Sequence, residues 1–510
     1  MKRNLLLIIA LFAYALSFGQ GEIDAFRYSN NDLSGTARGQ AMGGAFGALG
    51  GDVTGVAINP AGIGVYRSSE IVGNMSLISP IINSSTIQES NTKFNFENIS
   101  YISYYPLIKG DVLSLNFGFN YNRVKNFNQS YNASSSEMKT SLTDYMVNLT
   151  NGIPHYTWDY SDIYNTKVPW LSVLAWDGYL INMQDGSSNS YESILEIGER
   201  VSPKLNVSEK GCVEVYDFTI GSNISNFFFW GLTFAITDLS YSMTSYYDES
   251  FLGVQGSGFN LYNSLETKGS GYQLKAGVIV RPTDIFRIGL SYHSPIWYSM
   301  TDYYYANLTP RGIYDDNDRI VGMTETPNGS VSYYLRTPGS FTLSMAAVLS
   351  SKAIVSLDYE NKNYAAMNLK DKNRFNLGNV NTIIKEDYKN TSTIRAGFEY
   401  RFTPQLSGRL GYAWAQNPYS SSIRAIGDIQ VTAGTIPHYM ISNCATYMTG
   451  GLGFRFTPQF YCDLALVHRS QKDYLYYFQP VSIEGAAPDS FKGAYTTQSL
   501  KGLVTLGYKF

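Results

Sequence analysis

Hydrophobic and polar residues alternate along much of this 510-residue chain. In the last eleven residues, 500–510, Val504, Leu506, Tyr508 and Phe510 fall on one side, opposite mostly polar or small residues. Successive side chains of a β-strand point to opposite faces, so this pattern predicts a strand with one apolar and one polar face. The same two-residue period recurs over 112–122, 272–281 and 394–402.

The polar faces of these predicted strands carry charges, for example Lys275, Arg395 and Glu399. A soluble β-sandwich would have to bury such a face, which is costly. Apolar residues toward lipid and polar residues toward a lumen are typical of a transmembrane β-barrel. We therefore expect lipid to be faced by Phe117, Leu274 and Phe398. The lumen should be faced by Asn116 and Gly397.

Short turns and long polar segments separate the predicted strands. The short turns are 106–111, 222–226, 281–284, 350–352, 403–405 and 457–459, and the long segments are 82–96, 124–212, 238–269, 299–338, 363–390, 416–443 and 471–497. Six turns and seven loops predict an all-β, 14-stranded antiparallel barrel. Because short turns are periplasmic in such barrels, both chain ends are expected on the periplasmic side.

The largest predicted loop, 124–212, is too long for a plain connection. It contains three tryptophans and an apolar stretch at 168–181, which favours a folded extracellular cap with a helix. A hidden hairpin in this loop is the alternative, and it would raise the count to sixteen strands.

The N-terminus has the three parts of a secretory signal peptide. Lys2 and Arg3 precede an apolar run over 5–16, and small residues follow. We expect 1–20 to be a signal peptide cleaved near Gly19 or Gln20, and the barrel to occupy 68–510. No later stretch offers the ~18 uninterrupted apolar residues of a transmembrane helix.

Composition narrows the function classes. A net charge of −3 provides no basic field for nucleic acid, while 15% aromatic residues with a mean hydropathy of −0.16 suit a barrel. The three cysteines, Cys212, Cys444 and Cys462, are too scattered for a disulfide framework, so we expect free thiols, with Cys462 facing lipid. None of the four histidines stands in a recognisable motif that pairs a nucleophile with an activating base, and their spacing does not fit a metal site. We therefore expect no enzyme activity, no metal and no cofactor.

A glycine-rich segment over 35–64 interrupts this strand pattern. Gly39, Gly43 and Gly47 recur at a spacing of four, which on a helix leaves a flat face for close packing. A phosphate-binding loop is excluded, because no Gly-Lys-Ser/Thr follows. A flexible linker is the alternative to a compact plug, which we place at 21–67.

This segment, GTARGQAMGGAFGALGGDVTGVAINPAGIGVY, is similar to the N-terminal hatch of the FadL/TodX-like outer-membrane transport family. In that family an aspartate is followed, seven residues on, by Asn-Pro-Ala, and Asp52 with Asn59, Pro60 and Ala61 matches this spacing. Stretches 281–295, 336–346, 392–414 and 451–468 also resemble the family's barrel.

The resemblance implies a bacterial outer-membrane barrel, blocked by a hatch, for passive uptake of long-chain fatty acids or similar hydrophobic molecules with lateral release. The implied partners are the hydrophobic substrate, outer-membrane lipid and, during biogenesis, the barrel-assembly machinery; we expect a monomer. A related branch serves type IX protein secretion, which is the alternative function, and haem uptake and an open porin are further ones.

We further hypothesise which hatch residues form the ligand gate. Met42, Phe46 and Leu49 would meet the ligand or the barrel wall, and Asp52 would anchor the hatch to a lumenal base such as Arg287 or Arg395. The turn formed by Asn59, Pro60 and Ala61 would set the resting shape of the hatch.

Overall fold

The computed structural model describes residues 21–81, 92–108, 110–166, 168–196, 198–350, 352–420, 434–481 and 492–510. The predicted signal peptide, parts of four predicted loops and single residues of two predicted turns lie outside these residues. Within them, no helix is both long and apolar enough to cross a membrane.

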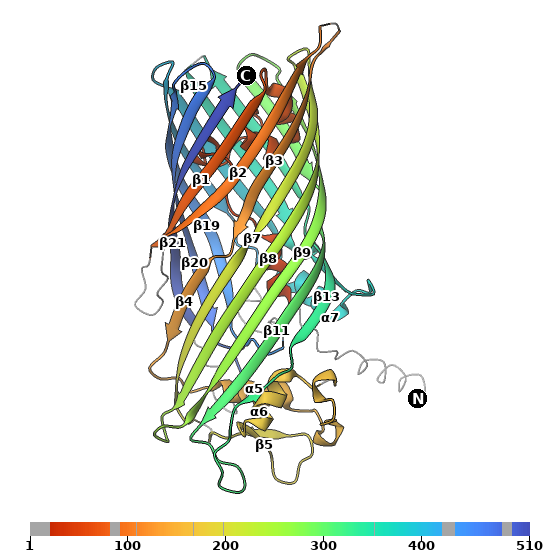
Figure 1. Cartoon of the computed structure of the whole chain (residues 1–510), viewed down its shortest axis with the longest axis vertical. Helices are drawn as coiled ribbons and strands as arrows, with labels where there is room; N and C mark the ends of the chain where they lie inside the picture. Colours follow the sequence, from red (N-terminus) through yellow and green to blue (C-terminus); the bar gives the residue numbers. More distant parts are fainter. Residues whose placement is uncertain are drawn as a thin grey trace.

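The wall is a closed antiparallel barrel of fourteen strands, as predicted (Figure 1). Its sheet closes where β1 pairs with β21. The wall strands are β1 (Glu70–Ile81), β2 (Lys93–Pro106), β3 (Val112–Asn126), β7 (Val201–Ile224), β8 (Phe228–Phe251), β9 (Gly258–Val280), β10 (Phe286–His293) with β11 (Trp297–Arg311), β13 (Gly329–Arg336) with β14 (Ser340–Leu349), β15 (Ala353–Asn363), β17 (Asn390–Arg401), β18 (Leu406–Ala415), β19 (Tyr439–Arg455), β20 (Phe460–Tyr476) and β21 (Lys492–Lys509).

Two adjacent wall strands are each broken at one point. The β10–β11 strand breaks at 294–296, and the β13–β14 strand breaks beside it at 337–339. Both breaks contain a proline, which cannot donate a ladder hydrogen bond. Three short strands extend the wall: β4 (Gln129–Ser134), β12 (Thr324–Glu325) and β16 (Asn368–Asp371).

The predicted lipid and lumen faces are confirmed. The side chains of Phe117, Leu274 and Phe398 are 43%, 55% and 40% exposed on the outer surface, whereas Asn116 and Gly397 are buried inside. The three cysteines are free, as predicted, and Cys462 lies on the outer face beside Leu464.

Several strands run far beyond the membrane, so the predicted loops 238–269 and 299–338 are wrong. β7 and β8 have 24 residues each and β9 has 23, whereas about 9–11 residues span a bilayer. Only residues 252–257 connect β8 with β9.

The polarity of the two strand faces reverses along β8, which explains this error. Outward residues are apolar up to Ile236 and polar from Asp238 onward. Inward residues change in the opposite sense, from Thr233 to Leu239 and Tyr241, which are buried. The outer wall therefore leaves the membrane near Ile236, and beyond it the strands enclose an apolar core.

The long connection after β4 folds into a cap at the extracellular end, at the bottom of Figure 1. It contains α5 (Leu142–Thr150), η2 (His155–Thr157), η3 (Ile163–Asn165), α6 (Trp170–Asp177), β5 (Ile181–Met183) and β6 (Tyr191–Ser193). The predicted helix is α6. The connection is 135–200, shorter than the predicted 124–212, because β3, β4 and β7 use both ends of that range.

The cap is fixed to the long strands by polar and aromatic contacts. The buried carboxylate of Glu249 on β8 accepts hydrogen bonds from Ser141 and from the Leu142 N–H at the start of α5. The Trp170 and Tyr304 rings lie 4.9 Å apart. The cap thus packs as part of the apolar core of the extracellular half.

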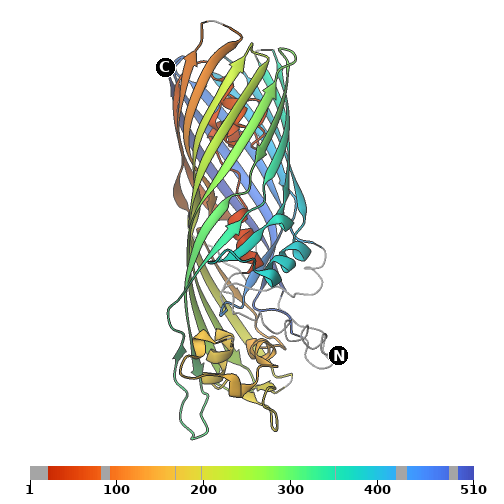
Figure 2. The same ribbon diagram turned by 90° about the vertical axis from the view of Figure 1, so that its right-hand side faces the viewer.

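Residues 21–66 lie inside the barrel, where Figure 2 shows them at two heights in red. Their helices are α2 (Glu22–Ser29), α3 (Ala37–Ala41), α4 (Val53–Ile58) and η1 (Pro60–Val65). We call residues 21–66 the hatch. The remaining helices, η4 (Tyr364–Ala366) and α7 (Gly378–Asp387), follow β15 and β16 at mid-height.

Candidate functional site

The hatch lies directly against glycines of the barrel wall. A Cβ on Gly411 would be 2.1 Å from Gly43 N, and one on Gly231 would be 2.2 Å from Pro60 O. The same close approach occurs at three further inward glycines: Gly277, Gly289 and Gly397. No larger side chain fits at these positions while the hatch stays in place, so the wall is shaped to the hatch backbone and, at Gly277, to the Asn59 side chain.

Polar wall side chains bind the hatch backbone. The Asp358 carboxylate accepts hydrogen bonds from the N–H groups of Phe46 (3.0 Å) and Gly47 (2.9 Å). Further donors reach hatch carbonyls: Asn116 to Ile63 (2.6 Å), Asn74 to Gly35 (2.8 Å) and Arg287 to Leu49 (2.5 Å). Buried backbone groups of an irregular segment need such partners, and the lumenal face of the wall supplies them.

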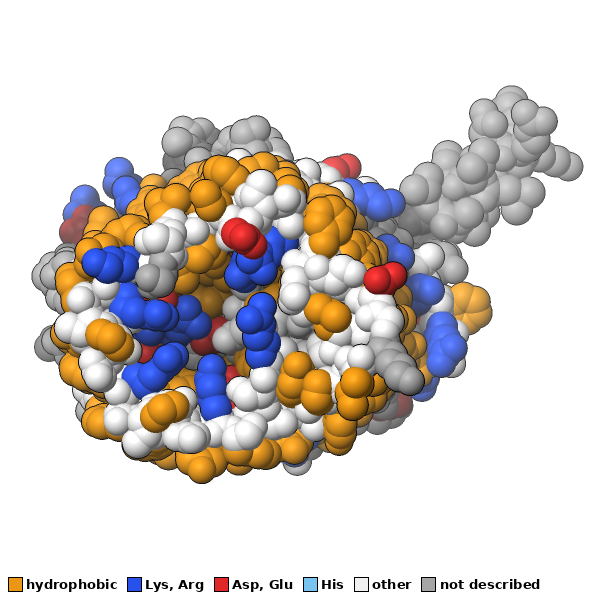
Figure 3. All heavy atoms as spheres, turned by 90° about the horizontal axis from the view of Figure 1, so that it is seen from above, with side chains coloured by type: hydrophobic (Ala, Val, Ile, Leu, Met, Phe, Trp, Pro, Cys, Tyr) orange, Lys and Arg blue, Asp and Glu red, His pale blue; other side chains and the backbone are white. Residues whose placement is uncertain are grey.

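A buried ion network joins the hatch to the periplasmic end of the wall. Arg38 of the hatch and Arg409 of β18 both bind Glu399, at 2.8 and 2.7 Å, and Arg409 also binds Asp463 at 2.6 Å. Figure 3, which views the barrel from this end, shows Lys and Arg side chains around the mouth. The periplasmic half of the lumen is thus polar and filled by the hatch.

The structure places the three apolar candidate residues of the hatch against its own helices and the wall. Met42, Phe46 and Leu49 are buried and form a cluster with Ala48 and Ala346. None of these three residues lines the cavities described below. Their role in gating stays a prediction.

The predicted pairing of Asp52 with Arg287 or Arg395 is wrong. Asp52 instead caps the N-terminus of α4, where it accepts hydrogen bonds from the Thr54 N–H and the Thr36 hydroxyl, both at 2.9 Å. An aspartate at this position satisfies a free helix N–H, which is a local interaction. Arg395 pairs with Glu360.

The turn around Pro60 is held on both sides. Asn59 Oδ1 accepts from the Ala61 N–H at 3.1 Å, and its Nδ2 donates to Gly47 O (2.8 Å) and to Val278 O of β9 (3.1 Å). Pro60 and Ala61 begin η1 and are buried. This single amide therefore links both halves of the hatch to the wall.

A cavity of about 290 Å³ lies beside the first part of the hatch, near the extracellular ends of β1, β2 and β21. Its lining is partly apolar, from the hatch and from strands far apart in sequence: Ile23, Phe26, Leu33, Phe127, Tyr131, Met243, Tyr439 and Val467. It is also charged, with six cations and four acids: Lys93, Arg123, Lys125, Arg469, Lys501 and Arg27, then Asp32, Glu97, Glu209 and Asp473. We call it the upper cavity, taking the extracellular side as up, which is the reverse of the view in Figure 1.

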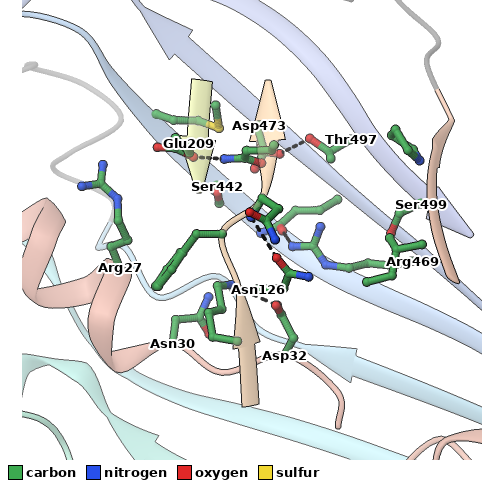
Figure 4. A pocket seen from close by; sticks show the side chains of 18 of the residues that line it. Arg27, Asn30, Asp32, Asn126, Glu209, Ser442, Arg469, Asp473, Thr497 and Ser499 are labelled. Carbon is green, nitrogen blue, oxygen red and sulfur yellow. Dashed lines mark hydrogen bonds and ion pairs between the residues drawn. The ribbon is translucent and has the colours of Figure 1, made fainter. Parts of the chain in front are cut away.

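Ion pairs and hydrogen bonds organise the charged side of the upper cavity (Figure 4). Asp32 binds Lys125 at 3.0 Å; burial opposes its ionisation, but Lys125 and Arg469 outweigh burial and lower the pKa of Asp32. Burial raises the pKa of Asp24 on α2 to about 6, although Arg27 beside it acts in the opposite direction. The cavity thus places a charged and largely ion-paired surface next to an apolar one.

A second cavity of about 240 Å³ lies between the hatch and the opposite wall. Its lining includes paired charges, such as Lys275 with Asp217 at 2.7 Å and Arg395 with Glu360. His293 contacts the carbonyl of Ile58 there at 2.9 Å. Apolar side chains such as Phe26, Val215 and Ile296 also line this cavity, so charged pairs and apolar groups are mixed on its surface.

The wall is only weakly closed beside the upper cavity. Backbone pairing of β2 with β3 ends at Asn98 and Asn122, although both strands continue. Beyond that point Asn95 accepts hydrogen bonds from Asn126 at 3.0 Å and from Arg123 at 3.3 Å. Side chains alone join the strands at this place.

Sequence reasoning missed the upper cavity. Much of its lining comes from strand ends that the polar composition assigned to loops, including Lys93, Lys125 and Asp473. The continuing two-residue alternation of those segments was the available signal.

A plugged, closed transmembrane barrel is the class that this fold and site define. Residues 249–476 match the family of outer membrane protein transport proteins (OMPP1/FadL/TodX). No curated protein sequence matches the chain significantly. The fold is similar to that of a Pseudomonas aeruginosa FadL homologue, at 14% identity and a TM-score of 0.55, covering 94% of this chain and 99% of that one.

It is also similar to the Ralstonia pickettii toluene transporter TbuX, at 13% identity and a TM-score of 0.50, covering 94% of this chain and 98% of that one. These matches confirm the resemblance, and the family match covers the barrel stretches 281–295, 336–346, 392–414 and 451–468 rather than the hatch motif. Part of the chain, residues 249–476, thus matches the model of this outer-membrane family, and the fold of the described chain is that of a FadL-type plugged β-barrel.

Proposed function

We propose that this protein takes up hydrophobic or amphipathic small molecules passively and releases them sideways through its wall. The observation that carries the proposal is the position of the upper cavity. It lies between the apolar core of the extracellular half and a periplasmic half that is polar and filled by the hatch.

The lining of the upper cavity suits an amphipathic ligand. A hydrocarbon chain would pack against side chains such as Phe127 and Met243, and an acid group would lie near Arg469 or Lys93. Long-chain fatty acids fit this description, and aromatic hydrocarbons such as the toluene named for TbuX would use the apolar part alone.

The polar part of the lumen on the periplasmic side supports lateral release. A hydrocarbon that continued toward the periplasm would meet the paired charges of the second cavity and then the hatch, and desolvating those charges is costly. The opening between β2 and β3 at Asn95 offers a shorter path into lipid. We therefore place the exit there.

A reversible crosslink tests this exit. Asn95→Cys with Asn126→Cys is made in a Cys212→Ser background, because Asn126 lies opposite Cys212. A short bis-methanethiosulfonate linker should then reduce uptake of labelled oleate, and dithiothreitol should restore it.

The matched control joins the same two strands where their backbones already pair, with Ser103→Cys and Phe117→Cys. Its uptake should not change on crosslinking. Unchanged uptake in the fully crosslinked Asn95 and Asn126 variant would refute the lateral exit at this place.

The alternative role in protein secretion gains no support from the matches reported above. If oleate and toluene both fail to enter cells that carry the intact protein at normal surface abundance, the small-molecule proposal is refuted as a whole, separately from the exit.

A further inference from the structure

A cationic patch lies on the outer surface of the wall, on β13, β16 and the turn that follows β16. Arg336, Lys370, Lys372 and Arg374 form it, and we call it the outer patch. Figure 3 shows Lys and Arg side chains on the outer surface at the right, the side where Figure 1 places β13 and α7.

Strand register brings these cations together. Arg336 lies opposite Asn368, and Tyr334 lies opposite Lys370, so two cations project from adjacent strands two residues apart in register. The Arg374 guanidinium lies 5.3 Å from the centre of the Tyr334 ring. Cross-strand neighbours are about 5 Å apart, which leaves the three side chains within reach of one anionic group.

The outer patch is not neutralised by neighbouring acids. Among the described residues, no carboxylate lies within ion-pair distance of its four cations. Asp371, in the same turn, accepts hydrogen bonds from the backbone N–H groups of Asn373 and Phe375. Phe375 is 71% exposed beside it, so the turn presents an aromatic ring together with positive charge.

The height of the outer patch places it in the headgroup layer of the membrane. Phe341 is the last exposed apolar residue of β14 toward the cell exterior, and Arg336 follows five residues further out along the wall. At about 3.4 Å per residue and a tilt near 40°, five residues correspond to roughly 13 Å beyond Phe341. The exposed Trp297 ring lies opposite Arg336 in register, and aromatic rings of this kind lie at the headgroup level.

The sector of the wall formed by β7 and β8 carries the opposite charge near the apolar band. Just above the apolar band, β7 and β8 carry Glu214 and Asp238, opposite each other in register. The outer patch therefore differs in charge from this sector near the apolar band, and a lipid headgroup can reach the patch from the membrane. The exposed lysines of β7 and β9, Lys204, Lys210 and Lys268, lie further toward the cell exterior.

We propose that the outer patch binds the phosphate groups of the anionic glycolipid in the outer leaflet. Guanidinium and ammonium groups form short, charge-assisted hydrogen bonds with phosphate oxygens, and several on one surface can hold one phosphorylated headgroup. The bound glycolipid would fix the orientation of this side of the barrel in the membrane. This inference does not depend on the transported substrate.

The test measures binding of rough lipopolysaccharide, which carries lipid A and a phosphorylated inner core, to the intact protein in a neutral detergent. The variant Arg336→Gln, Lys370→Gln, Arg374→Gln should raise the dissociation constant about tenfold or more. The control Lys204→Gln, Lys210→Gln, Lys268→Gln removes three exposed cations from β7 and β9 and should leave it within about twofold.

Two measurements on the unchanged protein keep the test independent of how the variants fold. Glycolipid dephosphorylated with hydrogen fluoride should bind as weakly as the patch variant binds the intact form. Equal binding of the two glycolipids, or an unaltered dissociation constant in a patch variant with normal heat-modifiable migration, would overturn the proposal. Displacement of the glycolipid by millimolar inorganic phosphate would overturn it too, because the site would then be one for free phosphate.

Discussion

Replacing Gly411 by alanine should dislodge the hatch while leaving the barrel intact. The new Cβ would lie 2.1 Å from Gly43 N, 2.3 Å from Met42 C and 2.5 Å from Thr449 Oγ1. Two of these three atoms belong to the hatch backbone, so no side-chain rotation can relieve the overlap. Gly43 itself has a φ of +64° and donates its N–H to Thr449 at 3.1 Å, which limits how far it can shift.

Overpacking of this kind costs about 1–3 kcal/mol when the structure absorbs it locally. Because every 1.4 kcal/mol is a factor of ten, the equilibrium between docked and displaced hatch should shift roughly tenfold to hundredfold toward the displaced form. The wall should fold normally, since β18 keeps its pairing with β17 and β19.

Conductance in planar bilayers measures this shift. Gly411→Ala should open more often than the unaltered protein, and cells that carry it should become sensitive to large antibiotics. Gly450→Ala is the matched control, because the nearest atom to its Cβ is 3.6 Å away, an ordinary contact. Conductance equal to that of the control, with normal heat-modifiable migration, would refute the claim that the hatch needs a glycine at position 411 to pack against the wall.

Two further predictions follow from the same geometry. Phe234→Arg, on the lipid-facing part of β8, should lower the free energy of unfolding of the inserted barrel by about 2–4 kcal/mol. Ser240→Arg, on the same face beyond Ile236, should lower it by only about 0–1 kcal/mol. Equal losses in chemical denaturation would mean that the membrane boundary is misplaced. The double change Asn59→Ala and Pro60→Gly removes the hydrogen bonds to Gly47 and Val278. It should impair oleate uptake without affecting insertion of the barrel. Normal uptake at matched surface abundance would contradict the gating role of this turn.

The sequence alone determined the strands and their faces within the membrane. Side chains of a strand alternate with a period of two whatever the strand pairs with, so local pattern was enough to assign Phe117 to lipid and Asn116 to the lumen. The turns and loops similarly set the number of strands at fourteen. The hatch could be recognised because its glycine spacing and the motif around Asn59 are local too.

Only the tertiary structure decided what medium each face meets and which charges pair. The two-residue alternation continues through Ile236 and Asp238, but the medium that the outward face meets changes there from lipid to water. Because the outward residues beyond this point are polar, their composition led to the prediction of a loop. Asp52 was free in sequence to bind a distant arginine, yet a helix N–H two residues away satisfies it. The upper cavity joins Asp32, Lys125 and Arg469 from three separate segments, because strand register and the fit of the hatch, which no local pattern encodes, bring them to one place.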